Sequence, residues 1–285
     1  MKSARQYLGF LVCCLVCGVA AGGDLSGTWV PKYHEDWDDR IPGPELGDYA
    51  GVPINEEARL FAESWDPSRL TLPEHQCRVH TAPYIFRGPM LFRAWEERNQ
   101  RTQDVERIRM YISTYEQDRT IYMDGREHPP AYAAHTWMGF STGKWDGKVL
   151  TVKTTHLKQN WHRRNGLPQS DQAELTEHFY RHGDYLTRVS VTADPVYLTE
   201  PVVKSEDFVL SQSTEGRRSW TWPCGIIVEV PRPQGEVPFY LPGQNPNIKE
   251  LDRWQVAPEA WQGGAATLYP NFAEDRDLRL KARTP

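Results

Sequence analysis

Apolar and polar residues alternate in short runs through the middle of the chain, between residues 90 and 210. Alternation with a period of two is typical of strands that bury one face. Turn residues such as Gln117-Asp118 and His182-Gly183 separate the runs. Sequential strands joined by short turns favour an antiparallel meander that closes into a barrel. The predicted strands are residues 24–30, 90–97, 105–115, 119–123, 137–145, 148–156, 173–181, 185–192 and 202–210, with 226–230 as a further candidate.

Helical patterns are few. Asn55 precedes two acidic residues and a short apolar run, which predicts a capped helix over residues 55–63. Short helices are also expected at 248–254 and 258–261, within a proline-rich tail. The chain is therefore expected to be mainly β, with a single antiparallel barrel-like domain and short helices.

The domain limits follow from the two ends of the chain. Residues 1–22 have the features of a signal peptide: Lys2 and Arg5, then an apolar run, then small residues for cleavage. The barrel is expected over residues 23–230, and a C-terminal tail, 231–285, is expected to wrap around it. This arrangement predicts a periplasmic or secreted protein without a stable membrane span after signal removal. A lipoprotein anchored at Cys17 is the alternative.

A hairpin is predicted at Asp146-Gly147, where Trp145 and Lys148 would close a two-residue turn. This register sets Trp137 opposite His156. The first strand of this hairpin carries small residues on the face that it shares with Trp137, so a trough is expected along that face. Either a neighbouring element or a ligand fills it. The small residues of the face are Gly139, Ser141 and Gly143.

Composition narrows the classes of function. Aromatic residues make up 12% of the chain, with 11 Trp and 13 Tyr, which suits β structure or a ligand-lined cavity. The net charge is -5 and no basic cluster stands out, so nucleic acid is not an expected partner. Beyond the signal peptide the chain keeps two cysteines, Cys77 and Cys224, and an even pair in an exported protein predicts a disulfide.

No metal signature or nucleophile motif is found among the candidate catalytic residues. The chain has nine histidines, but none has the spacing of a known metal motif. Ser141 lies between two glycines within the predicted hairpin, whereas a nucleophilic serine needs a strand, a sharp turn and then a helix. The basic loop Arg163-Arg164-Asn165-Gly166 is interpreted as a solvated turn, with an anion site as the alternative.

Glu177 is the most informative charged position. It alternates with Leu175 and Phe179, and a turn at His182-Gly183 would set it opposite Arg188. If this face is interior, the carboxylate must be paired or its pKa must rise, as happens at functional sites. If the face is exterior, Glu177 and Arg188 form an ordinary cross-strand ion pair.

Several motifs are similar to those of an uncharacterised family of exported bacterial β-rich proteins. They include Asp124-Gly125-Arg126-x-His128-Pro129-Pro130, Thr136-Trp137-x-Gly139-Phe140-Ser141-Thr142-Gly143-x-Trp145, Leu150-Thr151-Val152-x-Thr154-Thr155-His156 and Thr176-Glu177-His178-Phe179. The resemblance implies export and a β-rich fold, and no particular reaction. Gly27-x-Trp29 also resembles the first strand of lipocalin-like (calycin) barrels.

The favoured hypothesis is an exported protein that binds a small apolar or aromatic molecule in the barrel cavity. Its ligand-binding residues would be Trp137, Ser141, His135, Arg126 and Arg188. An alternative is a hydrolase or lyase in which Glu177 acts with His128 or His156 as acid and base. A structural envelope protein without a small ligand is the third possibility. The pattern assigns no cofactor.

Overall fold

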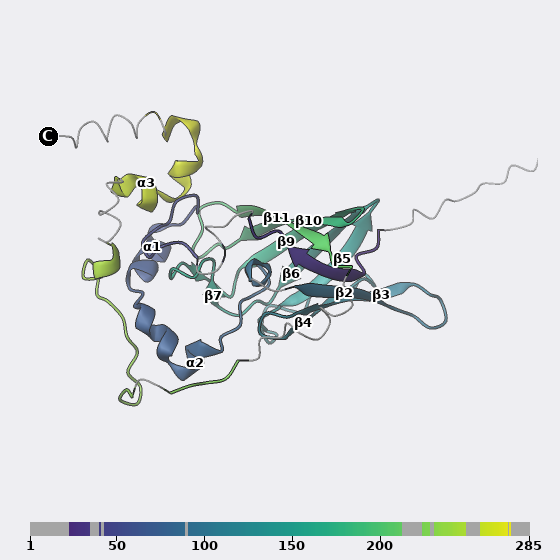
Figure 1. The fold of residues 1–285 in the computed structure, drawn as a ribbon, viewed down its shortest axis with the longest axis horizontal. Helices are drawn as coiled ribbons and strands as arrows, with labels where there is room; N and C mark the ends of the chain where they lie inside the picture. The colour runs from purple at the N-terminus through teal and green to yellow at the C-terminus, as the bar shows by residue number, and fades with distance from the viewer. Residues whose placement is uncertain are drawn as a thin grey trace, which may run out of the picture.

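The computed structural model describes residues 23–34, 40, 43–88, 91–212, 224–228, 231–248, 257–272 and 274. A closed barrel of nine strands forms the body of the protein, in the order β1-β11-β10-β9-β6-β5-β4-β3-β2 (Figure 1). The mainly β, barrel-like fold expected from the alternating pattern is confirmed. The barrel strands are β1 Gly27–Pro31, β2 Phe92–Arg98, β3 Val105–Ile112, β4 Gln117–Tyr122, β5 Phe140–Asp146, β6 Val149–Thr155, β9 Glu174–His182, β10 Tyr185–Ala193 and β11 Val202–Leu210. A separate two-stranded sheet pairs β7 Asn160–Trp161 with β8 Pro168–Gln169.

The barrel is antiparallel except for one pair of strands. β4 and β5 run parallel, with Ile121 beside Ser141. A tight turn cannot join parallel neighbours, so the chain from residue 123 to residue 139 must travel back along the barrel before β5 begins. We call this segment the crossover loop. It carries Arg126, His128 and His135, three of the residues singled out in the sequence.

The β5–β6 and β9–β10 hairpins both turn one position later in the chain than the sequence suggested. Asp146 pairs with Val149, so Gly147 and Lys148 form the turn, and Trp137 lies outside the strand. In both hairpins a glycine with positive φ takes the first of the two loop positions, as in a type II′ turn: Gly147 has φ 57° and Gly183 has φ 68°. The predicted register was therefore wrong by two residues. A shift of two keeps every side chain on its expected face.

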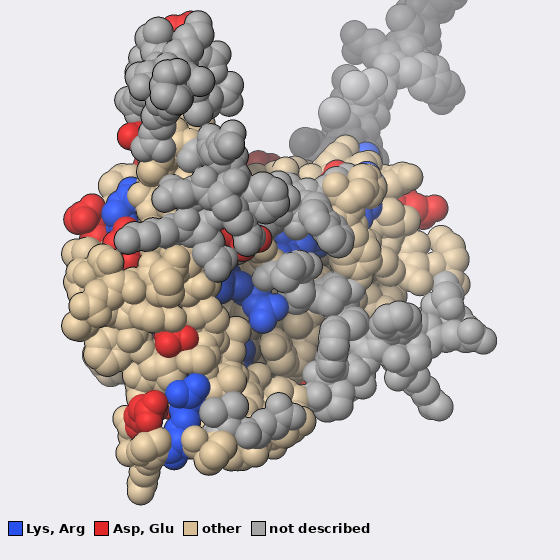
Figure 2. Space-filling model, turned by 60° about the vertical axis from the view of Figure 1, so that its left-hand side comes forward, with Lys and Arg blue, Asp and Glu red and all other residues tan. Residues whose placement is uncertain are grey.

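A layer of short helices and loops covers one end of the barrel, on the left of Figure 1. We call it the cap; it comprises residues 43–78 and the described tail segments 224–228, 231–248 and 257–272. The tail is tied to this layer, since Tyr49 N donates to Trp261 O at 2.6 Å and Asn245 Nδ2 donates to Glu63 O at 2.8 Å. Figure 2 turns the cap forward and shows Lys and Arg side chains in a hollow near the middle of that face. The helices of the cap are α1 Glu56–Glu63, η2 Pro67–Thr71, α2 Pro73–Gln76, α3 Pro258–Gln262 and η6 Gly264–Leu268.

The helix predictions are confirmed where an N-terminal capping side chain or a proline marks the first turn of the helix. Asn55 caps α1 by accepting a hydrogen bond from Ala58 N at 2.9 Å, and Pro258 opens α3. The helix expected at 248–254 and the signal peptide at 1–22 fall almost entirely outside the described residues. Residues 226–228 do not form a strand. None of the helices in the described ranges is long and apolar enough to cross a membrane.

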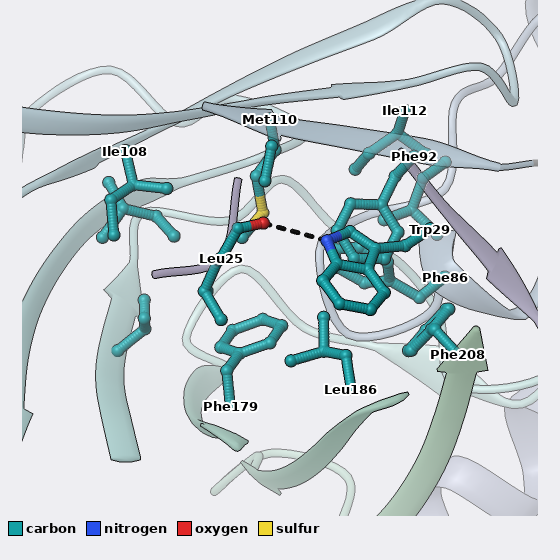
Figure 3. Close-up of a cluster of buried hydrophobic side chains, with 14 of the residues drawn as sticks. Leu25, Trp29, Phe86, Phe92, Ile108, Met110, Ile112, Phe179, Leu186 and Phe208 are labelled. Atoms are coloured by element: carbon teal, nitrogen blue, oxygen red, sulfur yellow. Dashed lines mark hydrogen bonds between the residues drawn. The ribbon is translucent and has the colours of Figure 1, made fainter. Parts of the chain in front are cut away.

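The chain's own side chains occupy the barrel interior. Segment 79–88, which we call the plug, includes the 3₁₀ helix η3 Ile85–Arg87. Phe86 of the plug packs edge-on against Phe92 and Phe208, with ring centroids 5.1 and 6.2 Å away. Figure 3 shows Trp29 within this cluster, where its Nε1 donates to Leu25 O at 2.9 Å. The buried apolar residues here include Leu25, Trp29, Ile85, Phe86, Phe92, Ile108, Met110, Ile112, Ile121, Leu150, Val152, Phe179, Leu186 and Phe208.

Candidate functional site

A pocket of about 210 Å³ lies between the cap and the capped end of the barrel. The cap contributes residues from α1's C-terminal side through α2, and the barrel end contributes the β3–β4 turn, β7 and the start of the plug. Aromatic and basic side chains dominate this surface. The lining residues are Trp65, Leu70, His75, Gln76, Arg78, His80, Tyr115, Trp161 and Arg164.

Two indoles and an imidazole build the apolar wall of the pocket. The Trp65 and Trp161 rings are nearly perpendicular, with centroids 5.3 Å apart. The His75 ring lies against both, 6.1 Å from Trp65 and 5.8 Å from Trp161. All three side chains are buried. Edge-to-face packing holds aromatic rings in fixed positions, so the wall is formed before any ligand arrives.

Local sequence explains how the cap delivers these rings. Asp66 caps η2 by accepting a hydrogen bond from Ser68 N at 2.8 Å, and this fixes the chain directly after Trp65. Pro73 then opens α2, a single turn that carries His75 and Gln76 into the pocket. On the barrel side, Trp161 belongs to β7.

A disulfide fixes the end of α2. Cys77 and Cys224 are bonded, as predicted, with Cα atoms 5.5 Å apart across a sequence separation of 147. The neighbouring Gln76 amide is fully used: Nε2 donates to Ile227 O at 2.6 Å and to Thr71 O at 2.9 Å, and Oε1 accepts from Ile227 N at 2.7 Å. Gln76 is therefore a rigid wall of the pocket rather than a free hydrogen-bonding group.

The two histidines of the pocket are neutral at physiological pH. Burial, with Arg78 and Arg69 nearby, lowers the pKa of His75 to about 4. Burial, with a contribution from Arg164, lowers the pKa of His80 to about 3. His75 Nδ1 is buried and has no hydrogen-bond partner in the described part of the chain. The positive charge of the pocket lining therefore comes from arginine alone.

The β3–β4 turn brings Tyr115 to the pocket in an unusual backbone conformation. Tyr115 and Glu116 both have positive φ, 57° and 52°. The left-handed region is unfavourable for residues with a Cβ, and such strain collects at functional sites. The turn places the Tyr115 ring 5.9 Å from the His80 ring.

Glu177 lies on the inner face of the barrel, fully buried, in a network of charged side chains. Its Oε1 accepts from Arg119 Nη1 at 3.0 Å and from Arg188 Nε at 2.7 Å, and Arg119 Nη2 donates to its Oε2. Burial alone would raise the pKa of Glu177, but Arg119 and Arg188 outweigh it and hold the pKa below its usual value. Glu177 is therefore ionised and enclosed by protein.

The network continues from Arg188 to the plug. Arg188 Nη1 donates to Glu206, and Arg87 Nε lies 2.8 Å from Glu206 Oε1, close enough for an ion pair although not aligned for a hydrogen bond. Arg188 Nη2 also donates to Ala82 O at 3.2 Å. The charged residues thus bind the plug to β10 and β11. Ser141 joins at the other end, 3.4 Å from Arg119 Nε.

His128 and His156 lie on the outer face of the barrel, linked through Thr155. Pro130 O can only accept, so His156 Nε2, 3.0 Å away, donates to it, and in the neutral form of the ring Nδ1 is then the acceptor. The Thr155 hydroxyl, 2.7 Å from both Nδ1 atoms, then donates to His156 and accepts from His128. Neutral His128 completes the chain by accepting at Nε2 from Thr142 Oγ1 at 2.9 Å.

Arg126 and His135 also belong to this outer region. Arg126 is held by Asp124 and lies over the Tyr122 ring, with its guanidinium carbon 3.8 Å from the ring centroid. His135 donates from Nδ1 to Leu157 O at 2.8 Å, and its ring centroid is 5.2 Å from that of His156. Trp137, at the end of the crossover loop, has Lys158 Nζ 4.8 Å from its ring centroid.

Seven of the predicted residues therefore form two groups on opposite sides of the barrel wall, while Trp137 packs against the barrel core. Arg126, His128, His135 and His156 gather outside, whereas Glu177, Arg188 and Ser141 gather inside. Glu177 does not face either histidine that was expected to act with it as acid or base. Most of the pocket was missed in the sequence, although the basic loop containing Arg164 had been considered as an anion site.

No family model, curated protein or solved structure matches this chain. The described residues contain no group of three or more His, Cys, Asp or Glu side chains placed to hold a metal ion.

Proposed function

We propose that this protein is an exported binding protein that holds a small, planar, largely apolar molecule in the pocket between cap and barrel. The observation that carries the proposal is the preformed aromatic wall of Trp65, Trp161 and His75 beside a hollow of about 210 Å³. Ligand sites are usually concave, apolar and already formed. Typical drug-sized sites measure ~300–1,000 Å³, so this pocket suits a molecule built on one ring.

The contents of the barrel favour this location over the barrel interior. The plug and the charged network occupy the space in which a lipocalin-like protein would hold its ligand. The trough beside Gly143 is filled as well, because a Cβ at this position would lie 2.7 Å from Met123 Sδ and 2.8 Å from Ile121 Cγ2. The packing interpretation of the trough is therefore the better supported one.

Export is part of the proposal because of the N-terminal sequence and the disulfide. Residues 1–22 have the composition of a signal peptide, and structural disulfides persist in oxidising compartments. The resemblance to exported bacterial proteins supports the same localisation.

Filling the pocket tests the proposal. Leu70 lines the pocket and is 39% exposed, so Leu70→Trp should occupy the hollow without disturbing the core. Leu60→Trp is the matched control, since Leu60 is 47% exposed on α1 and does not line the pocket. A panel of single-ring compounds is screened by saturation-transfer NMR against the mature protein. Binding that survives in Leu60→Trp and disappears in Leu70→Trp supports the proposal. Binding unaffected by Leu70→Trp, or no binding by any ring compound, contradicts it.

A further inference from the structure

We propose that the ligand of this pocket is an aromatic or similarly planar anion, whose carboxylate is bound by Arg78 and Arg164. This inference rests on the proposed function, because it names the chemical class of the molecule that occupies the same pocket. It adds to that function the two residues that would bind the charged group of the ligand.

The first observation is that neither arginine is paired with a carboxylate within the described residues. Within the described residues, neither guanidinium makes a hydrogen bond or an ion pair, and the contact found for Arg78 is with the Trp161 ring, 5.2 Å from its guanidinium carbon. Two arginines of the barrel differ, since Arg98 contacts Glu96 and Arg107 contacts Glu97. An arginine in a pocket without a carboxylate has donors available for a ligand.

The second observation is the charge of the pocket lining. It contains two arginines and no carboxylate, and the two histidines are neutral. Arg78 and Arg164 are both half-buried, where the attraction between charges is stronger than in water. Burial and Arg69 lower the pKa of Arg78, and Glu74 offsets only part of this effect, so an anion in the pocket would make the environment of Arg78 more favourable.

The third observation is the arrangement of ring and charge. Arg78 lies over the same Trp161 ring that forms the apolar wall, so the basic and aromatic surfaces adjoin. A ligand ring packed on the indoles would carry a substituent toward the guanidinium. Arginine binds carboxylates through two parallel hydrogen bonds, which fixes orientation as well as charge. The amide of Gln76 cannot compete, since both of its donors are already used.

The experiment compares aromatic acids with their neutral amides. Benzoate and benzamide, and nicotinate and nicotinamide, have matched shapes and differ in charge. Affinities are measured by NMR titration of the mature, disulfide-bonded protein at constant ionic strength and pH 7. The acids should bind at least about tenfold more tightly than the amides, the difference expected for a hydrogen bond to a charged group. Arg78→Gln and Arg164→Gln should each remove most of this preference.

Arg98→Gln is the control, because Arg98 lies on the barrel surface with its side chain 49% exposed and paired with Glu96. It should leave both affinities unchanged. Equal binding of acids and amides would overturn the anionic inference and leave the pocket as a site for neutral rings. A preference for acids that persists in both pocket arginine variants would also overturn it. Failure of every acid and amide to bind would contradict the proposed function itself.

Discussion

Arg119 and Glu177 face one another inside the barrel, and the carboxylate accepts hydrogen bonds from both terminal nitrogens of the guanidinium. Neither side chain has appreciable contact with solvent. Arg119 has no other carboxylate within ion-pair distance in the described chain, whereas Arg188 also has Glu206. Removing the charge of Glu177 would therefore leave a buried cation without compensation.

Glu177→Gln is expected to lower the free energy of unfolding by ~3–5 kcal/mol, the usual cost of breaking a buried pair. Glu174→Gln on the same strand is the control; its pair with Lys153 is about half exposed and should contribute under ~1 kcal/mol. Urea denaturation measures both variants. If both variants lower the free energy of unfolding by the same small amount, the buried network around Glu177 does not stabilise the fold. A double-mutant cycle with Arg119→Met isolates the pair itself.

The acid sensitivity of the fold should depend on His80. Its folded-state pKa is about 3, below the ordinary value near 6.5, so the unfolded chain takes up a proton first as the pH falls. The folded state therefore has its full stability above pH 7.5, where His80 is neutral in both states. It loses stability progressively below pH 6.5, where the unfolded chain binds the proton. At pH 5 the loss is ~2 kcal/mol for this one group.

His80→Phe keeps the ring contacts with Tyr84 and Tyr115 and removes the titration. We expect a flatter dependence of the melting temperature on pH between 7.5 and 5. His182→Phe, at an exposed position on β9, should retain the wild-type slope. An unchanged slope in His80→Phe would show that His80 takes up its proton at the same pH in the folded and the unfolded chain.

Gly143 is predicted to be a packing glycine. A Cβ would meet Met123 and Ile121 at less than 3 Å, so Gly143→Ala should destabilise the protein by ~1–3 kcal/mol. Gly225 has open space around it, and Gly225→Ala should change stability by less than ~0.5 kcal/mol. Thermal unfolding compares the two. A fully stable Gly143→Ala protein would mean that the trough is open enough to admit a ligand.

Thr155 is expected to hold the crossover loop to the barrel through its hydroxyl. Thr155→Val removes the group that bonds to both histidines, and losing these part-buried bonds should cost ~1–3 kcal/mol. Thr120→Val is the control, on the outer face of β4. Nitrogen shifts of the imidazoles report the tautomers directly. Each imidazole should have one defined tautomer in the wild-type protein and lose it in Thr155→Val. Unchanged nitrogen shifts in the variant would contradict the assigned hydrogen-bond directions.

The alternating pattern was sufficient to predict the strands, because each barrel strand buries one face and exposes the other. It also placed Glu177 on the same face as Leu175 and Phe179 but left open whether that face was interior, and the structure shows that it is. Arg188, which the sequence set opposite Glu177, is also an inward residue of its strand, and so are Arg119 and Glu206, which were not considered from the sequence alone. Charges of both signs at inward positions indicate a buried network.

The pocket could not be predicted in the same way. Its residues lie far apart in the sequence, from Trp65 in the cap to Arg164 beyond β7, and long-range packing brings them together. The hairpin registers were also beyond reach, since Asp-Gly and Gly-Asp sequences allow turns that differ by one position. The parallel β4–β5 pair depends on the path of the crossover loop, which carries no periodic pattern.

The central claim is that a ligand binds between cap and barrel rather than inside the barrel. Indole N–H resonances in a ¹⁵N-labelled protein test this most directly, because Trp65 and Trp161 line the pocket and Trp29 lies in the barrel core. Assignments come from single Trp→Phe variants. On titration with benzoate, the Trp65 and Trp161 resonances should shift and the Trp29 resonance should not. Shifts confined to Trp29, or spread equally over all three, would contradict it.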